Sequence, residues 1–178
     1  MTITVEQVIA HARDREYMSG VERDKHRIKI TGEVFTNTEL VTILLDSLEK
    51  QDSNIFKDPT RTFMDPSFGD GQFLTEVLIR KMQNDIDFKT ALSTLYGTEF
   101  QKDNVLEAHN RLLCGQEELR EIVKKNLVET DALDYHWEFG TEKNFDTTPK
   151  VVKPVKAKRK ETTVDLSMFE KPALQETN

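Results

Sequence analysis

The stretch from residue 61 to residue 133 alternates between strand patterns and helix patterns, and this alternation constrains the fold more than any other feature of the sequence. The expected order is strand 62–65, helix 72–82, strand 92–99, helix 102–113 and strand 126–130. Each expected strand is short and apolar, and each expected helix carries apolar residues at helical spacing. Strands that are joined through helices pair in parallel. The sequence therefore predicts an α/β fold with a parallel sheet.

The regions on both sides of this core have a different composition. Residues 1–31 predict a short amphipathic helix and a charged connector. The domain itself is expected to span 32–140, with a further helix whose apolar stripe lies within 40–48. Residues 141–178 are rich in lysine and poor in large apolar residues, so we expect a flexible, disordered basic tail with one apolar island at 164–174.

Composition restricts the class of protein. A chain of 178 residues suits one α/β domain, and its net charge of −7 argues against nucleic acid being wrapped by the whole surface. The single cysteine, Cys114, cannot form an internal disulfide, and no cysteine or histidine pair has metal-ligand spacing. No secretory signal and no apolar stretch of membrane-spanning length is visible. We expect a cytoplasmic protein with no metal and no membrane partner, and a structural role for a buried Cys114.

Three loops carry the residues that could bind a ligand. The glycine-containing loop 65–73 lies where the first strand turns into the first helix, which is where doubly wound sheets bind nucleotide-like ligands. Glu99 ends the second strand, where a carboxylate can accept both hydroxyls of a ribose. Asp131 follows the third strand and could accept the amine of an adenine ring, with Phe100 and Leu133 as apolar walls. The glycine loop alone is equally typical of a simple turn, and each acid alone is more typical of a solvated strand end or a helix cap, but their order favours one ligand site.

Four motifs share these positions. They are GEVFT at 32–36, DPSFGDGQFL at 65–74, LYGTEF at 95–100 and NLVETDAL at 126–133. In combination they resemble the motifs of class I S-adenosylmethionine-dependent methyltransferases, and specifically of the N6-adenine DNA methylases of restriction-modification systems. The chain is also similar to short methylase-like proteins encoded by tailed bacteriophages.

The resemblance implies a Rossmann-like parallel sheet of the class I methyltransferase type, truncated after about the third or fourth strand. It also implies S-adenosylmethionine as cofactor. GEVFT would lie beside the methionine end, the glycine loop would cradle methionine and sugar, Glu99 would hold the ribose and Asp131 would contact the adenine. The implied cofactor-binding residues are Phe35, Thr36, Asp65, Pro66, Gly69, Gly71, Phe73, Glu99, Phe100, Asp131, Ala132 and Leu133.

The sequence departs from the family pattern in three places. Asn37 stands where the family usually has proline, and Phe68 where a small residue is common. The Asn/Asp/Ser-Pro-Pro-aromatic motif that holds a flipped target base is absent, and 144–149 occupies its expected place. Catalytic residues are therefore unassigned. Two hypotheses for the function follow. The first is that the chain is an N6-adenine DNA methyltransferase or its cofactor-binding part. The alternative is that it is a catalytically inactive, methylase-derived adaptor that acts on a restriction-modification or replication partner.

The family's fourth strand would pair with the far side of the first strand. Without it, the first strand is an edge with apolar side chains on both faces, and such a surface usually has a partner. We expect a homodimer or a second methylase subunit there. The alternatives are that Val151 and Val152, or the N-terminal helix, cover this edge.

The tail suggests two further partners. Six basic residues could bind DNA phosphates weakly and without sequence specificity, and the alternative is a solvated linker that keeps the tail extended. They are Lys150, Lys153, Lys156, Lys158, Arg159 and Lys160, and of the two interpretations the composition favours the solvated linker. Residues 165–169 resemble the short peptides that dock on the bacterial sliding clamp, with Asp165 in place of glutamine and with Leu166, Met168 and Phe169 as apolar anchors.

Overall fold

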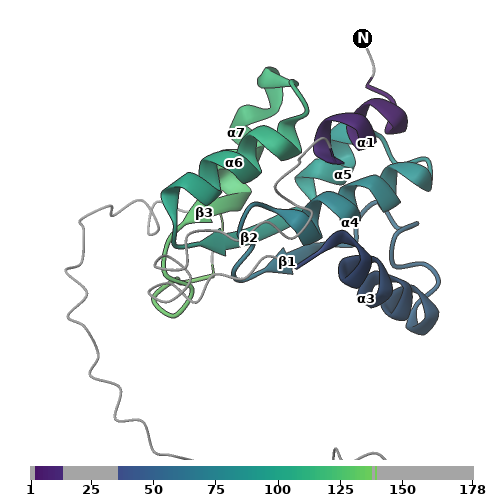
Figure 1. Cartoon of the computed structure of the whole chain (residues 1–178), viewed down its shortest axis with the longest axis horizontal. Coiled ribbons are helices and arrows are strands. Elements are labelled where there is room, and N and C mark those ends of the chain that lie inside the picture. The colour runs from purple at the N-terminus through teal and green to yellow at the C-terminus, as the bar shows by residue number, and fades with distance from the viewer. Residues whose placement is uncertain (1–2, 14–35, 138, 140–178) are drawn as a thin grey trace, which may run out of the picture. The chain divides into compact units, whose positions relative to one another are not determined.

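The computed structural model describes residues 3–13, 36–137 and 139, which fall within one compact unit, Met1–Asp146. Figure 1 shows how the elements are arranged. Their order is α1 (Val5–Arg13), α3 (Thr38–Gln51), β1 (Phe63–Asp65), α4 (Gln72–Gln83), α5 (Phe88–Ser93), β2 (Leu95–Glu99), α6 (Lys102–Leu113), the 3-10 helix η2 (Glu117–Leu119), α7 (Arg120–Asn126) and β3 (Leu127–Glu129).

Within the described residues, the sheet has three parallel strands in the order β1-β2-β3. Met64 of β1 is in register with Tyr96 of β2, and Thr98 of β2 with Val128 of β3. The predicted α/β architecture with a parallel sheet is therefore confirmed, with β2 in the centre of the sheet.

The second strand is shorter than the sequence predicted. The sequence pattern predicts that residues 92–94 are part of this strand, but in the structure they belong to the end of helix α5 and its cap. The side chain of Asp87 accepts a hydrogen bond from the backbone N–H of Thr90, which caps the start of this six-residue helix. Leu95 is thus the first residue of β2.

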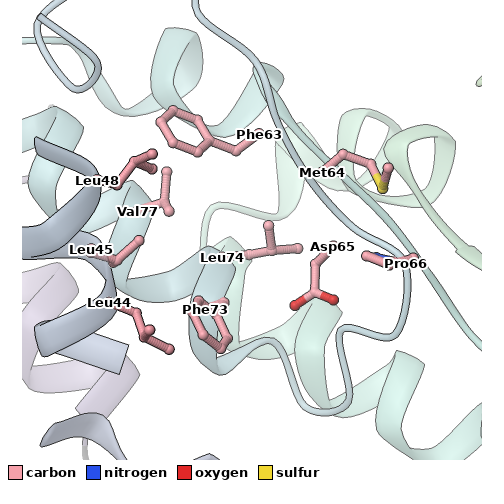
Figure 2. A pocket seen from close by; sticks show the side chains of 10 residues that line it. All are labelled: Leu44, Leu45, Leu48, Phe63, Met64, Asp65, Pro66, Phe73, Leu74 and Val77. Atoms are coloured by element: carbon pink, nitrogen blue, oxygen red, sulfur yellow. The ribbon is translucent and has the colours of Figure 1, made fainter. Parts of the chain in front are cut away.

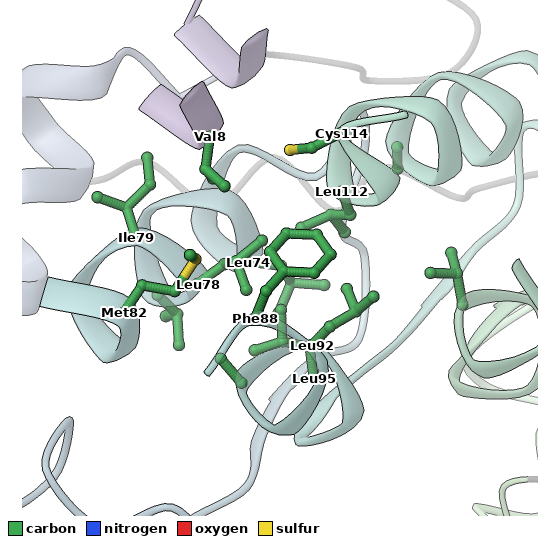
Figure 3. Packing of buried hydrophobic residues seen from close by; sticks show 14 of the residues in the cluster. Val8, Leu74, Leu78, Ile79, Met82, Phe88, Leu92, Leu95, Leu112 and Cys114 are labelled. Atoms are coloured by element: carbon green, nitrogen blue, oxygen red, sulfur yellow. The ribbon is translucent and has the colours of Figure 1, made fainter. Parts of the chain in front are cut away.

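The core lies between the sheet and the helices that follow its strands. Figure 3 shows Leu74 and Leu78 of α4 near Phe88 of α5 and Leu112 of α6. Leu95 of β2 contributes from the sheet and is 1% exposed. Fully burying a side chain of this size stabilises the fold by about 1.5–3 kcal/mol, so this cluster is the main apolar contribution to the unit.

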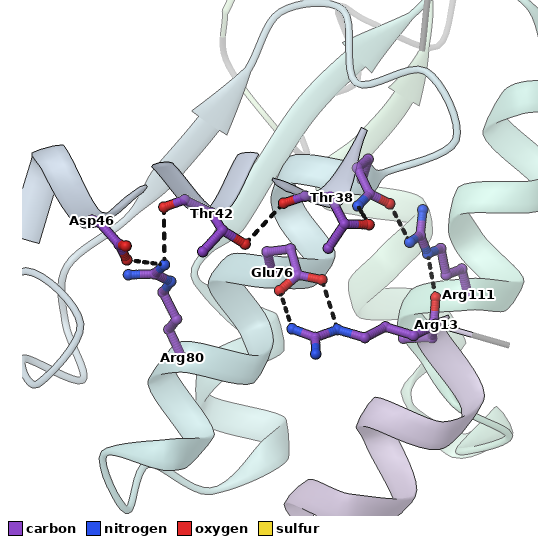
Figure 4. Close-up of polar contacts among 9 residues, drawn as sticks. Arg13, Thr38, Thr42, Asp46, Glu76, Arg80 and Arg111 are labelled. Carbon is purple, nitrogen blue, oxygen red and sulfur yellow. Dashed lines mark hydrogen bonds and ion pairs between the residues drawn. The ribbon is translucent and has the colours of Figure 1, made fainter. Parts of the chain in front are cut away.

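Helix α1 belongs to this core. Val8 and Ala12 are completely buried, and α1 packs against α4 and α6. The buried Arg111 of α6 donates to the carbonyl oxygen of Ala12 over 2.9 Å, and Arg13 forms a two-pronged ion pair with Glu76 of α4 at 2.6 and 3.0 Å (Figure 4). The predicted N-terminal helix is present, and its main contacts are with helices rather than with strand β1.

An aromatic cluster covers the other face of the central strand. Side chains alternate along a strand, so Tyr96 points away from the face on which its neighbour Leu95 is buried. The ring of Tyr96 lies 5.0 Å from that of Phe139, and Tyr135 lies 5.2 Å from Phe139 and 5.4 Å from Trp137. The chain after β3 therefore returns across the sheet to β2.

Candidate functional site

The three predicted ligand loops lie at one edge of the sheet. All strands are parallel, so their carboxyl ends point the same way. The backbone N–H of Thr130, which follows β3, donates to the carbonyl oxygen of Glu99 at the end of β2 over 2.9 Å. The backbone N–H of Phe68, in the loop after β1, donates to the carbonyl oxygen of Thr98 over 3.1 Å. We call this the carboxyl edge.

Two glycines shape the loop after β1. Gly69 has a φ of 56° and Gly71 a φ of 85°, a region that favours glycine. A Cβ atom on Gly71 would also lie 3.2 Å from the Cβ of Ala108 in α6. Gly71 therefore lets α4 begin and lets α4 and α6 approach closely. Asp65 tightens the start of the loop by accepting the Ser67 N–H over 3.0 Å.

Glu99 connects the loops after β1 and β2. Its Oε2 accepts the backbone N–H of Gly69 over 3.0 Å, and its Oε1 accepts that of Gln101 over 2.8 Å. The residue is buried, with 7% exposure. A carboxylate oxygen can accept more than one hydrogen bond, so the fixed carboxylate keeps acceptor capacity for a ligand hydroxyl.

Asp65 has an unusual electrostatic environment. Burial raises the pKa of the Asp65 carboxyl, and the negative charge of Glu99 raises it further, although the hydrogen bond from Ser67 acts in the opposite direction. Two carboxylates at one edge create a negative potential. The carboxyl edge is therefore suited to a ligand that carries both hydroxyls and a positive charge.

Gly97 and Thr98 support the loop after β1, although neither was predicted as a site residue from the sequence. A Cβ atom on Gly97 would lie 2.6 Å from the carbonyl oxygen of Asp65 and 2.7 Å from Cδ1 of Phe68. The Thr98 hydroxyl donates to the carbonyl oxygen of Pro66 over 2.7 Å. Glycine inside a strand is a sequence signal for close backbone approach, and it could have identified Gly97. Phe68 itself is 3% exposed and fills the space above Gly97, which accounts for a large residue at this position.

Asp131 lies in the turn directly after β3. Its side chain accepts the backbone N–H of Leu133 over 2.9 Å, and its carbonyl oxygen accepts that of Asp134 over 3.0 Å. Asp131 and Ala132 are half-buried, whereas Leu133 is 94% exposed. Phe100, which follows Glu99, is 58% exposed. The side chains of both expected apolar walls, Phe100 and Leu133, therefore extend into solvent.

Three other predicted residues line a groove that continues from this edge. Asp65, Pro66 and Phe73 line a cavity of about 410 Å³ between α3, β1 and α4 (Figure 2). Thr36 is half-buried, and it lies two residues before Thr38, whose hydroxyl accepts a hydrogen bond from the Gln72 side chain over 2.8 Å. The start of α3 is thereby fixed beside the glycine loop.

Several predicted residues lie outside the described part of the chain. Phe35 and the pair Val151 and Val152 are among them. The candidate DNA-binding residues Lys150, Lys153, Lys156, Lys158, Arg159 and Lys160 and the candidate clamp-binding residues Leu166, Met168 and Phe169 lie there as well. Their proposed roles remain predictions.

Cys114 and the residues that follow β3 complete the description of the site's surroundings. Cys114 is buried, as predicted, and its thiol donates to the carbonyl oxygen of Arg111 over 3.3 Å. His136 is exposed, and Trp137 packs edge-on against Tyr135. Within residues 3–13, 36–137 and 139, no cluster of histidine, cysteine and acidic side chains could hold a metal ion, and no helix is long and apolar enough to cross a membrane.

Comparison with known proteins does not extend this description. No protein-family model matches the chain, and no curated protein and no solved structure matches it. The geometry of the carboxyl edge and the motifs in the sequence are therefore the basis for a functional proposal.

Proposed function

We propose that the chain binds S-adenosylmethionine at the carboxyl edge and is an N6-adenine DNA methyltransferase, or the cofactor-binding part of one, with a Rossmann-like methyltransferase fold. The observation that carries the proposal is the buried Glu99 carboxylate, held by the backbone N–H groups of Gly69 and Gln101. Such fixed acceptors suit the two vicinal hydroxyls of a ribose.

The other groups at this edge fit the rest of the cofactor. The carboxylates of Asp65 and Glu99 would stabilise the positive charges of the sulfonium and the amino group. Asp131 would accept the adenine amine, and Phe100 and Leu133 would cover the ring with side chains that are otherwise 58% and 94% exposed. Burial of these two side chains on binding would add affinity.

The cofactor would supply the methyl group, and the chain would bind and orient it. Positioning of the donor against an acceptor amine is a major contribution to such a transfer. DNA contacts would come from the basic residues Lys150–Lys160, weakly or together with a partner, because residues 1–146 carry 28 acidic against 18 basic side chains. We place this activity in the cytoplasm.

A second candidate function is favoured by the missing Pro-Pro-aromatic motif. In this case the chain is a catalytically inactive, methylase-derived adaptor that acts on a restriction-modification or replication partner, with Leu166, Met168 and Phe169 as a possible tether to a sliding clamp. Such an adaptor would bind the cofactor but would not transfer its methyl group.

Titration calorimetry with S-adenosylmethionine tests the shared part of both functions. We expect binding by the wild type and a loss of at least about tenfold in affinity for Glu99→Gln, since a glutamine cannot accept from both N–H groups and a hydroxyl. The matched control is Glu129→Gln, an exposed acid two positions before Asp131, and it should bind as the wild type does. Absence of binding by the folded wild type would refute the proposal.

Methyl transfer then separates the two functions. The full chain is incubated with adenine-containing DNA and cofactor that is radiolabelled on its methyl group. Incorporation of label into DNA, lost in Glu99→Gln, supports the methyltransferase. Binding without incorporation supports the adaptor.

A further inference from the structure

The groove lined by α3, β1 and α4 is apolar except for one carboxyl group. Strand β1 has a free side, because among residues 3–13, 36–137 and 139 it pairs with β2 only. The groove has a volume of about 410 Å³, and of its ten lining residues all but Asp65 are apolar (Figure 2). Small-molecule sites typically have such a size, with apolar walls and a few polar groups that orient the ligand.

The Asp65 carboxyl group has no cationic partner within the described part of the chain. Its Oδ1 accepts the backbone N–H of Ser67 over 3.0 Å, and the charged residue that acts on it is Glu99, which is also negative. Burial raises the pKa of the Asp65 carboxyl, and the charge of Glu99 raises it further. A positive group beside Asp65 would offset both effects, because it stabilises the charged form of the carboxyl. The position of Asp65 in the groove therefore favours a cationic ligand group.

The walls of the groove favour a ligand with an apolar body. Leu44 of α3 and Met64 of β1 are 47% and 52% exposed, whereas Leu45 and Leu74 are 5% and 2% exposed. All four line the groove, which thus has a buried floor and, among the described residues, an exposed rim. A ligand between α3 and α4 would remove this rim from water, and the gain in affinity depends on the apolar area that it covers.

We propose that this groove binds a small amphiphilic amine, with the ammonium group at Asp65 and the apolar chain or ring between α3 and α4. At about 30 Å³ for each non-hydrogen atom, the groove holds roughly a dozen such atoms. The charges of Asp65 and Glu99 would repel a carboxylate or a phosphate ester, and a hydroxyl group would leave their mutual repulsion in place. An amine is the ligand class that matches both the walls and the carboxyl group.

This site goes beyond the proposed methyltransferase function and does not rest on it. Asp65 belongs to the groove and also to the carboxyl edge. An amine in the groove would therefore compete with the positively charged part of S-adenosylmethionine for the same carboxyl group. For this reason the amine is tested in the absence of the cofactor.

Titration calorimetry of the full chain with n-octylamine, n-octanol and octanoate tests the proposal. The three probes share an alkyl chain and carry a positive, a neutral and a negative head group at neutral pH. We expect n-octylamine to bind at least about tenfold more tightly than n-octanol, because only the amine forms an ion pair with Asp65. Octanoate should not bind.

Two variants assign this difference to Asp65. Asp65→Asn removes the charge and keeps an acceptor for the Ser67 N–H. Its affinity for n-octylamine should fall to that for n-octanol, which itself should stay as in the wild type. The matched control is Glu118→Gln, an exposed acid of η2 that does not line the groove, and it should bind all three probes as the wild type does. Circular dichroism checks that both variants are folded.

Methyl NMR of protein labelled at its methionine methyl groups locates the bound amine. The signal of Met64, at the rim of the groove, should shift with n-octylamine. The signal of Met82, which is 7% exposed and does not line the groove, is the internal control and should stay unchanged.

Three outcomes would overturn the proposal. One is that the folded wild type does not bind n-octylamine, or binds it without a shift of Met64. Another is equal affinity for the amine and the alcohol, which would indicate a purely apolar surface. The third is an equal loss of affinity in Asp65→Asn and Glu118→Gln, which would indicate general attraction to an acidic protein. Because no cofactor takes part, each of these results leaves the S-adenosylmethionine proposal to its own titration.

Discussion

The carboxyl edge of the sheet and the unpaired side of β1 differ in how far their side chains are engaged by other described residues. At the carboxyl edge, polar groups of β2 bind the loop after β1: the Glu99 carboxylate accepts from Gly69, and the Thr98 hydroxyl donates to Pro66. At the free side of β1, Met64 and Ile43 are more than half exposed. The first region is thus fixed by its own hydrogen bonds, whereas the second leaves apolar side chains exposed among the described residues.

The largest expected effect concerns the buried support behind the carboxyl edge. Arg111 is 1% exposed, lies 3.5 Å from the Asp70 carboxylate and bonds to Gln72 at the start of α4. Arg111→Met removes one partner of a buried ion pair and should lower the free energy of unfolding by about 3–5 kcal/mol. Urea denaturation measures this loss.

The control for this prediction is an exposed pair of the same type. Arg120 binds Glu117 on the surface, so Arg120→Met should cost less than about 1 kcal/mol. Equal losses for the two variants would mean that the buried network does not support the site.

The next largest effect comes from the close contact between β2 and the glycine loop. A Cβ atom on Gly97 would overlap the Asp65 carbonyl oxygen, so Gly97→Ala should destabilise the fold by about 3 kcal/mol and displace the loop. Gly115→Ala is the matched variant, because its Cβ atom would meet nothing within 4 Å. Gly115→Ala should lower the free energy of unfolding by only about 1 kcal/mol, because the φ of 77° at this position disfavours a side chain. A well-tolerated Gly97→Ala would show that the loop can move away, and that the site is not fixed in advance.

A smaller effect depends on pH. Because the folded state raises the pKa of Asp65, this carboxyl keeps its proton to a higher pH in the folded than in the unfolded chain. Its contribution to stability is therefore present below the unfolded pKa and is lost as pH rises through the folded one. Asp65→Asn should be more stable than the wild type near pH 7, and this advantage should vanish under acidic conditions. Thermal unfolding across this pH range measures the difference, and an advantage that is constant with pH would contradict the assignment.

The smallest effect is expected on the outer side of α3. Ile43 is 57% exposed, so Ile43→Ala should change the free energy of unfolding by less than about 0.5 kcal/mol. Leu45→Ala on the buried side should cost about 2–5 kcal/mol. Chemical denaturation of both variants sharpens the contrast between the two sides of α3. A large loss at Ile43 would mean that another segment already covers this residue.

The sequence was informative where the structure follows from local patterns. Alternating strand and helix patterns predicted the parallel sheet, and they also predicted that Glu99 ends the second strand and that Asp131 follows the third. Helix α5 was missed because six residues are too few to show a helical period.

Contacts between distant residues could not be predicted in this way. The bond between Arg111 and Ala12 joins residues 99 positions apart, and Tyr96 meets Phe139 across the sheet. Local periodicity carries no information about such pairs. The same holds for Phe68, whose burial depends on the missing side chain of Gly97 in the next strand.

Titration of the ¹⁵N-labelled protein with S-adenosylmethionine tests the central claim most directly. The backbone amides of Gly69 and Gln101 donate to the Glu99 carboxylate, so we predict that their NMR signals shift on binding, together with those of Asp131 and Leu133. The amide of Gly115, in an open turn after α6, should remain unchanged. Spectra that stay identical at millimolar cofactor, or shifts confined to residues away from the carboxyl edge, would contradict the proposed site.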